Sequence, residues 1–441
     1  MNNYFFKCDI SGIQSFIFNV PSDGAAKELK NRSMYVQDIS EKCLQAFEDY
    51  FGKDNTKEFY KGGGNFYLKI ETEKTEEELF DFKETVNKKY RLQDIFPYID
   101  FVKDEGQESI NDLLDKINKK IQKTKHQRPI EYKEFFFEPI EFKININEIK
   151  GINGQVPKDK HNNILDFDEI AKRSEGDKKL AALKLDVDNL GKLFRDRTEN
   201  DYKKLSDALK DFFDAKFLQL IEQLEMKDYI YVVFSGGDDC FLIGCWNKIF
   251  ALAIELRQKF DEFQKDLKIQ IPSLPQEEIT FSAGIVVVSP KYPVMRLAEE
   301  VEEVLESSKK VENKNSVNVF GKTLSWKEFE QSQAISKQLF DLIDKKGESK
   351  SLVARIKSSD IGFDKLQQKA LNGKISLPKV WRLKYYLRNV KKENEPEVGK
   401  LFEEYTKAVL KALMQGKNTS PDIYPVAARW AELLLKQNEN L

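Results

Sequence analysis

The chain has few of the residues that build disulfides, zinc sites and histidine-based metal centres. Its four cysteines are Cys8, Cys43, Cys240 and Cys245. None lies in a C-x-x-C pair, so neither a structural zinc site nor a disulfide framework is expected. The two histidines, His126 and His161, are followed by Gln127 and Asn162. Because no His-Asp pair occurs, a nuclease of the His-Asp type is not expected.

Long apolar runs and a strong net charge are also missing. No stretch approaches the roughly 18 apolar residues of a membrane span, and the N-terminus lacks the pattern of a secretion signal. Lys and Arg number 72 against 74 Asp and Glu, a net charge of -2. No global positive field therefore attracts nucleic acid. We expect a cytoplasmic protein without membrane contacts, in which any contact with RNA uses local patches or partner proteins.

What is present is enough apolar sequence for several cores. The 441 residues are 40% hydrophobic, with 32 phenylalanines, and 33% charged, which is typical of soluble globular domains. Periodicity divides the chain into four parts. We expect two mixed units of strands and helices at 1–124 and 179–324, a linker or small insert at 125–178 and a helical C-terminal domain at 325–441.

An internal repeat relates the two mixed units. The first contains Cys8-Asp9-Ile10-Ser11-Gly12 and later Gly62-Gly63-Gly64-Asn65. The second contains Leu185-Asp186-Val187-Asp188-Asn189 and later Gly236-Gly237-Asp238-Asp239. The two spacings are nearly equal, and each covers a strand, a long helix and a returning strand. We therefore predict two copies of one fold that face each other.

The acidic residues of the second copy indicate a metal site. Gly236-Gly237-Asp238-Asp239 lies between two apolar strands, as in a tight hairpin, and alone is more often a solvated turn. However, Asp186 and Asp188 end another apolar strand about 50 residues earlier. An adjacent strand would bring the four carboxylates together, and they would need cations such as Mg²⁺ or Mn²⁺. A zinc ion is not expected.

These motifs resemble the large cyclase subunit of type III CRISPR effector complexes. The resemblance rests on Leu183-Lys184-Leu185-Asp186-Val187-Asp188-Asn189-Leu190-Gly191 with Phe234-Ser235-Gly236-Gly237-Asp238-Asp239. In the first unit, Asp9 to Ile17 and Leu29 to Ser33 are similar to the Csm branch of that family. The implied fold is α+β, with two ferredoxin-like palm domains and a helical C-terminal domain.

The resemblance implies that cyclic oligoadenylate is made from ATP at a two-metal site after target RNA binds. It assigns catalysis to Asp186, Asp238 and Asp239, which also bind the metals together with the carbonyl of Val187; Asp188 is a less certain member. The implied partners are other type III effector subunits, guide RNA and target RNA. The implied nucleotide-binding residues are Ser11, Gly12, Ile13, Arg32, Ser33, Gly62, Gly63, Gly64, Asn65, Asn189, Leu190, Gly191, Ser235, Gly236, Gly237 and Lys309.

Several of these residues also have ordinary structural interpretations. Lys309 could be a solvated helix lysine, and Arg32 a surface salt bridge. In the first unit Gly64 and Asn65 replace two acids, so we expect that copy to be catalytically silent. It could hold the second ATP, or its glycines could form only a flexible hairpin.

Other functions stay open at this point. Family members often carry a His-Asp nuclease domain and a zinc element between the palms; here the sequence begins in the first palm and the linker has no cysteine. A diguanylate cyclase is disfavoured because Cys240 follows the acidic pair. Joining ATP to another adenosine-containing acceptor, such as S-adenosylmethionine, is an alternative, as is a noncatalytic scaffold. A polymerase is disfavoured because no basic tract with interleaved aromatics that could hold a template duplex is evident.

Overall fold

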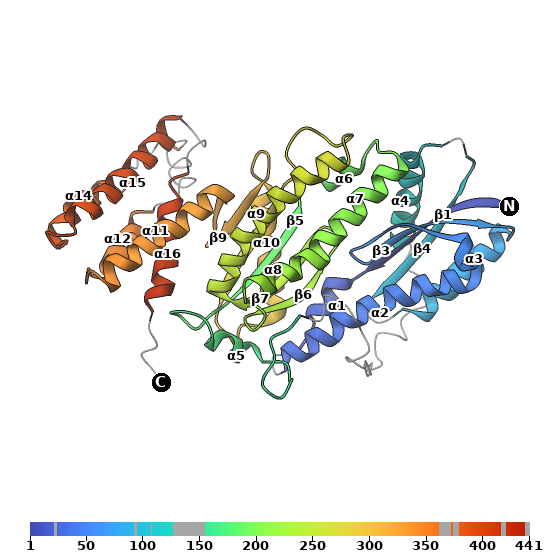
Figure 1. Ribbon diagram of the computed structural model, residues 1–441, viewed down its shortest axis with the longest axis horizontal. Coiled ribbons are helices and arrows are strands. Elements are labelled where there is room, and N and C mark those ends of the chain that lie inside the picture. The colour runs from blue at the N-terminus through green and yellow to red at the C-terminus, as the bar shows by residue number, and fades with distance from the viewer. Residues whose placement is uncertain are drawn as a thin grey trace.

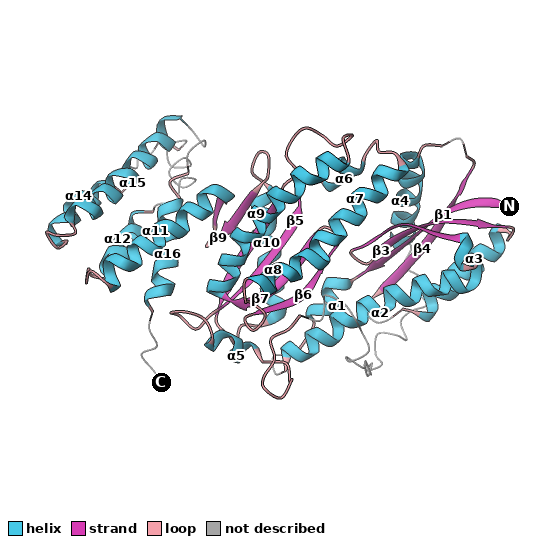
Figure 2. Cartoon of the chain, viewed as in Figure 1, coloured by secondary structure: helices cyan, strands magenta, loops and turns pink. Residues whose placement is uncertain are grey.

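The computed structural model describes residues 1–21, 24–91, 95–106, 108–126, 155–360, 372–373, 379–415 and 420–436, without the side chains of 413–415. Two mixed units of strands and helices lie side by side, and a helical unit lies at one end (Figure 1). Figure 2 shows that the described strands are confined to the two mixed units. The predicted α+β fold with a helical C-terminal part is therefore confirmed.

The first unit is built on an antiparallel sheet with the order β2-β3-β1-β4. Its main elements are β1 (Asn2–Ser11), α1 (Ile13–Phe18), α2 (Ala25–Phe51), β2 (Thr56–Gly62), β3 (Asn65–Thr72), α3 (Glu76–Lys89), β4 (Phe96–Asp104) and α4 (Ile110–His126). Successive β1 side chains point to opposite faces. Phe6 and Cys8 pack in the core that α2 and α3 cover, whereas Phe5 packs against Leu113 and Ile117 of α4.

The second unit has a six-stranded sheet with the order β10-β9-β8-β5-β7-β6. Its elements are β5 (Leu180–Val187), α6 (Leu190–Phe194), α7 (Glu199–Asp211), a π-helical turn (Phe212–Lys216), α8 (Phe217–Gln223), β6 (Ile230–Gly236), β7 (Asp239–Cys245), α9 (Trp246–Gln270), β8 (Phe281–Val288), α10 (Val294–Lys309), β9 (Ser316–Val319) and β10 (Lys322–Ser325). Leu183 and Leu185 of β5 pack in the core formed with α7, α8 and α9. The opposite face of β5 lies toward α10, which packs on β5 and β8.

The predicted repeat is present down to individual backbone groups. In each unit the strand β1 or β5 is followed by a residue with positive φ, Gly12 in one unit and Asn189 in the other, which precedes a short helix. The Ile10 N–H donates to the carbonyl of Gly64, and the Val187 N–H donates to that of Asp238, both at 3.0 Å. Positions 9, 12 and 64 thus correspond to positions 186, 189 and 238.

The two units are held together by buried contacts. The Ser33 hydroxyl donates to the carbonyl of Val233, and the Tyr231 hydroxyl to that of Ala26, both at 2.6 Å. The rings of Phe18 and Phe241 lie 4.6 Å apart in one core that both units share. Burying hydroxyls and aromatic rings across this boundary fixes how the two hairpins face each other.

The predicted linker at 125–178 is more than a connection. Residues 127–154 lie outside the described residues, but 155–178 contain α5 (Phe167–Lys172) and pack against both units. Leu165, Phe167 and Ile170 are buried in the shared core. Helix α4 ends at His126, so the expected division at 124 falls within a helix; the exact domain boundaries stay a prediction.

The C-terminal unit is helical in its described part. Its helices are α11 (Trp326–Asp344), α12 (Ser351–Ser359), α14 (Trp381–Tyr386), α15 (Glu395–Gln415) and α16 (Ile423–Leu435). They enclose a separate core, while Val426 and Trp430 of α16 pack into the second unit. Within the described ranges, no helix is both long enough and apolar enough to span a membrane.

Candidate functional site: two facing hairpins

Asp238 and Asp239 occupy different positions in the hairpin between β6 and β7. Gly236 pairs with Asp239, so Gly237 and Asp238 form the two-residue turn. Gly237 has φ +69°, a value that glycine adopts without strain. Asp238 therefore lies at the tip of the hairpin, whereas Asp239 begins strand β7.

Strand β5 brings the third acid to this hairpin. Asp186 lies directly opposite Asp239 in the antiparallel pairing of β5 with β7, so both side chains point to the same face of the sheet. The hydrogen bond from the Val187 N–H to the Asp238 carbonyl ties the end of β5 to the turn. The three acids named from the sequence are therefore neighbours.

Burial disfavours the charged form of these carboxylates and so raises the pKa of each. Burial and the nearby Asp186 raise the pKa of Asp238 to about 6. Burial and the nearby Asp238 raise the pKa of Asp239 to about 7. Burial also raises the pKa of Asp186, although the Lys309 ammonium opposes that effect. Such shifts are common where charged groups are crowded for a chemical purpose.

Lys309 is the cation of this site. Its Nζ lies 2.8 Å from an Asp186 carboxylate oxygen and 3.2 Å from Glu306. The side chain is only 20% exposed, so it is not the solvated helix lysine considered above. On the same face, Lys184 pairs with Glu302 of α10. Helix α10 thus provides Lys309 as the partner of Asp186 and Glu302 as the partner of Lys184, both residues of β5.

The acids are not arranged around a common point as metal ligands would be. In the part of the chain that the structure describes, no three acid, histidine or cysteine side chains are grouped so that they could hold a metal ion. The Asp186 carboxylate is paired with the Lys309 ammonium instead. The donor set still fits a hard divalent cation, since the three carboxylates at the end of β5 and in the adjacent hairpin offer only oxygen ligands.

Asp188 does not join the other acids, contrary to the expectation of four clustered carboxylates. It is buried, and its carboxylate accepts hydrogen bonds from the Thr280 hydroxyl at 2.8 Å, the Ser282 hydroxyl at 2.8 Å and the Asn315 N–H at 3.0 Å. These donors satisfy a buried anion internally. Asp188 thus fixes the loop after β5 to β8 and β9.

The first unit repeats the acid–lysine pair without the other acids. Asp9 occupies the position of Asp186, and Lys125 of α4 lies 2.7 Å from its carboxylate, as Lys309 of α10 does in the second unit. Lys7 lies 3.3 Å from the same carboxylate. The cross-strand partner of Asp9 is Asn65. Because two lysines neutralise its one acid, this copy offers no comparable site for a cation.

A cleft of about 460 Å³ lies where the two hairpins meet. A Cβ atom on Gly237 would lie 3.4 Å from the backbone nitrogen of Gly63, and one on Gly62 would lie 3.3 Å from the Cα of Gly237. The glycines thus allow the two backbones to touch. Of the residues predicted from sequence, those lining the cleft are Ile13, Ser33, Gly62, Gly63, Gly64, Ser235, Gly236, Gly237 and Asp239.

The remaining predicted residues lie outside the cleft lining. Arg32 donates to the Phe16 carbonyl at 2.9 Å and pairs with Glu28, which favours a structural role. The Ser11 hydroxyl contacts Asp9, and Asn65 contacts the carbonyl of Gly63. Gly12 and Asn189 are left-handed residues at the starts of short helices, and Leu190 and Gly191 lie in α6.

Some residues that line the cleft were not predicted, because they belong to no recognisable sequence motif. They are Gln14, Ile17, Val36, Gln37, Ser40, Glu41, Lys61, Lys210, Asp214 and Phe234. Most lie on α2 or on the helices after β5, where polar residues normally indicate only a solvated face. The repeat was the one available signal, because it pairs α2 with α7 and predicts that both helices flank the hairpins.

Comparison with known domain families matches both units. Residues 3–141 match the family described as Csm1 subunit domain B, and residues 179–318 match Cas10/Cmr2, second palm domain. Two relatives bear the same name, CRISPR system single-strand-specific deoxyribonuclease Cas10/Csm1 (subtype III-A). The one from Methanocaldococcus jannaschii is 34% identical over 37% of this chain and 23% of its own length. The one from Streptococcus thermophilus is 26% identical over 72% of this chain and 54% of its own length.

Solved structures share the fold. Csm1 from T. onnurineus aligns with a TM-score of 0.74 at 19% identity, over 99% of this chain and 70% of that one. A Csm1-Csm4 cassette in complex with AMPPNP aligns with a TM-score of 0.70, and one in complex with cA4 aligns with a TM-score of 0.69, both at 18% identity. Both cover 98% of this chain and 70% of the other.

The matched regions include both hairpins and both acid–lysine pairs. The chain spans about half or less of the length of the curated relatives. The resemblance to the large subunit of type III CRISPR complexes is confirmed, and the chain matches the Cas10/Csm1 subunit of subtype III-A.

Proposed function

We propose that the second unit is a nucleotidyltransferase that makes cyclic oligoadenylate from ATP, as a subunit of an RNA-activated type III complex. The observation that carries this proposal is the pairing of Asp186 with Asp239, beside Asp238 at the tip of a glycine hairpin. A noncatalytic scaffold has no use for desolvated carboxylates that repel one another. That AMPPNP and cA4 occur in complexes of structural neighbours supports the proposal.

The three acids would hold Mg²⁺ or Mn²⁺, with the carbonyl of Val187 as a further ligand. When bound, two cations lower the pKa of the attacking 3′-hydroxyl and neutralise charge on the α-phosphate and the departing pyrophosphate. Lys309, released from Asp186 by a cation, would then be free to bind the triphosphate. The ion pair at 2.8 Å keeps this ammonium close to the acids in the meantime.

The first unit would bind the second ATP without taking part in the chemistry. Its glycines line the cleft, and contact the hairpin that carries Asp238 and Asp239. A nucleotide held there would present its 3′-hydroxyl across the boundary, which supplies the proximity that a bimolecular reaction needs. Asp9 keeps its two lysine partners in this scheme.

The proposed partners are a Csm4-type subunit, guide RNA and target RNA. The full-length protein would be incubated with ATP and Mg²⁺ or Mn²⁺, alone and with these partners, and the products identified by mass spectrometry. Oligoadenylates that disappear in the Asp238→Asn/Asp239→Asn variant would support the proposal. A product mass that includes another adenosine-containing acceptor would instead support conjugation. If no nucleotide product forms although the complex assembles, the scaffold interpretation replaces the proposal.

A further inference from the structure

A basic, aromatic segment lies in the helical C-terminal unit, away from the hairpins. Residues 379–392 contain six Lys or Arg and no Asp or Glu, with Trp381, Tyr385 and Tyr386 between them. No tract that holds a template duplex was expected, but basic and aromatic residues do alternate in this one short segment of the chain. Its short length and its place among helical patterns hide it in a chain whose net charge is -2.

Two aromatic rings of this segment are exposed on one side of helix α14. Trp381 is 60% exposed and Tyr385 is 63% exposed. Residues four apart in a helix share a face, so the two rings lie one turn apart. Exposing two large rings together costs hydration free energy that a monomer normally avoids. Leu383 and Tyr386 of the same helix are buried in the C-terminal core and hold α14 in place.

The exposed rings border a cleft of about 470 Å³, and none of the described residues that line it is acidic. The lining residues are Arg355, Ser358, Ser359, Lys379, Trp381, Arg382, Leu383, Tyr385, Tyr386 and Asn389. Within the described ranges, none of the three lining cations forms an ion pair with a carboxylate. Their charge is therefore available to an anion that enters the cleft.

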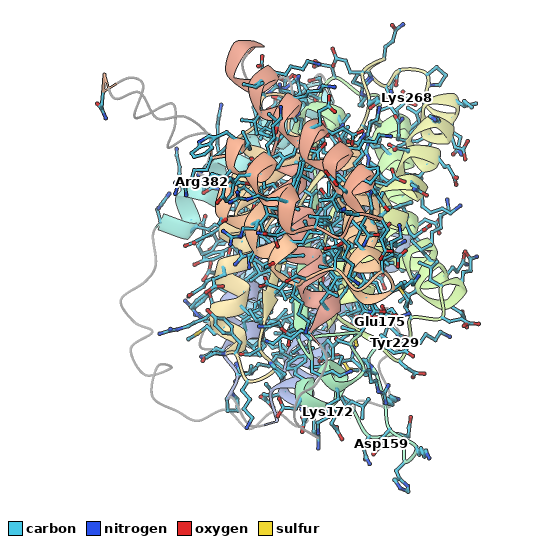
Figure 3. All side chains as sticks on the ribbon, turned by 90° about the vertical axis from the view of Figure 1, so that its left-hand side faces the viewer. Asp159, Lys172, Glu175, Tyr229, Lys268 and Arg382 are labelled. Atoms are coloured by element: carbon cyan, nitrogen blue, oxygen red, sulfur yellow. The ribbon has the colours of Figure 1, made fainter. Side chains whose placement is uncertain are left out.

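The cations also lie against the rings. The Arg382 guanidinium lies 5.3 Å from the Trp381 ring centroid, and that of Arg388 lies 3.1 Å from the Tyr385 centroid. Arg355 from α12 lies 5.1 Å from the ring of Tyr386. Figure 3 views the molecule from the end that carries the helical unit and shows Arg382 at its outer edge. Charge and stacking surface are thus combined on one exposed side.

We propose that this aromatic-basic surface, formed by Arg355, Lys379, Trp381, Arg382, Tyr385 and Arg388, binds a single-stranded polynucleotide. Base faces would stack on Trp381 and Tyr385 while the cations contact the phosphates, the combination that single-strand binding sites use. A duplex hides its base faces, so exposed rings would gain nothing from it. The site lies in another unit from the acidic hairpin, and the inference does not depend on the proposed function.

The test is fluorescence anisotropy with the full-length protein and three labelled probes. These are a 12-nucleotide oligouridylate, the matching oligothymidylate and a 12-base-pair duplex. Saturable binding of either single strand in preference to the duplex is expected, and the stronger of the two identifies RNA or DNA as the ligand. Trp381→Ala/Tyr385→Ala is expected to weaken binding by about tenfold or more, because base stacking contributes strongly to single-strand affinity. Trp381→Phe keeps an aromatic ring and should retain most of the affinity for the single strand.

Charge is tested separately from stacking. Lys379→Gln/Arg382→Gln should weaken binding and reduce the dependence of log affinity on log salt by about 0.7 for each phosphate left without a cationic partner. Phe80→Ala, which removes a ring that is 51% exposed in another unit, and Lys407→Gln on α15 serve as controls and should bind as the unmodified protein does. Equal binding to the duplex, or binding that the α14 variants leave unchanged, would overturn the proposal, as would the absence of binding to either strand.

Discussion

Asp186 and Asp239 face each other across adjacent antiparallel strands, and Asp9 and Asn65 occupy the same pair of positions in the first sheet. One copy of the fold thus carries two acids where the other carries an acid and an amide. This difference lies at equivalent backbone positions, so it separates the chemistry of the site from the architecture that holds it.

The stability of the metal-free protein should depend on pH through the hairpin acids. Burial raises the pKa of Asp238 to about 6 and of Asp239 to about 7, whereas an unfolded chain has about 3.9. Between these values the folded state keeps protons that the unfolded state has lost. Its free energy of unfolding therefore falls as pH rises from about 4 to 7. In EDTA, the Tm of Asp238→Asn/Asp239→Asn should rise relative to the unmodified protein across this range. A constant difference would contradict the burial of these acids.

Divalent cations should restore the stability that the metal-free protein loses as pH rises. A cation competes with protons for the carboxylates, so the increase in Tm caused by Mg²⁺ or Mn²⁺ should grow between pH 5.5 and 8. The same cations should leave Asp239→Asn nearly unchanged, and Asp9→Asn should respond as the unmodified protein does. Differential scanning fluorimetry measures all three. Equal stabilisation of the Asp239→Asn variant would place the metal elsewhere.

Lys309 should contribute to nucleotide binding. Lys309→Met removes a charge that lies 2.8 Å from Asp186, and without a charge-assisted hydrogen bond to the triphosphate the KM for ATP should rise by roughly tenfold or more. The neighbouring Lys310 is exposed, so Lys310→Met provides a control of the same charge. Steady-state kinetics on the active complex distinguish the two. If both variants have the KM of the unmodified protein, the role of Lys309 is limited to its pair with Asp186.

Gly284 should be required for the approach of α10 to the sheet. A Cβ atom at Gly284 would lie 2.5 Å from the Leu305 backbone nitrogen and 2.8 Å from the Val301 carbonyl oxygen. In Gly284→Ala the helix must move outward and take Lys309 with it. Overpacking of this kind costs about 1–3 kcal/mol, so both Tm and ATP turnover should fall. Gly399→Ala, where the nearest atom lies at 3.9 Å, should lose neither.

Much of the fold could be predicted because periodicity and the repeat agree. The helix expected at 25–51 is α2, and the strand expected at 180–187 is β5. The repeat also predicted that two copies of one fold face each other, because the two motifs recur at nearly equal spacing. By contrast, the helix expected at 201–225 contains the π-helical turn at Phe212–Lys216, which no periodic pattern reveals.

The limits of prediction at the site have a physical origin. Asp186 lies near the end of one apolar strand, and Asp238 and Asp239 lie at the turn between two others. Pairing of these strands was expected to bring the three acids together. Asp188 could not be separated from them, because its partners Thr280 and Ser282 come from a strand about 90 residues later. The pairing of Asp9 with Lys125 is equally distant in sequence. Long-range ion pairs and hydrogen bonds decide which acids are free, and a single sequence does not show them.

The most direct test compares Asp186→Asn with Asp9→Asn. Each substitution breaks an acid–lysine pair at the equivalent position of one unit, 2.8 Å long in the second and 2.7 Å in the first. Asp9→Asn also breaks the pair of Asp9 with Lys7, so it is the more disruptive substitution and a stringent control. Nucleotide products from ATP and Mn²⁺ would be quantified by mass spectrometry in the assembled complex. Loss of product in Asp186→Asn, with product retained in Asp9→Asn, is the predicted result. Product that persists in Asp186→Asn would contradict the assignment of catalysis to the second unit.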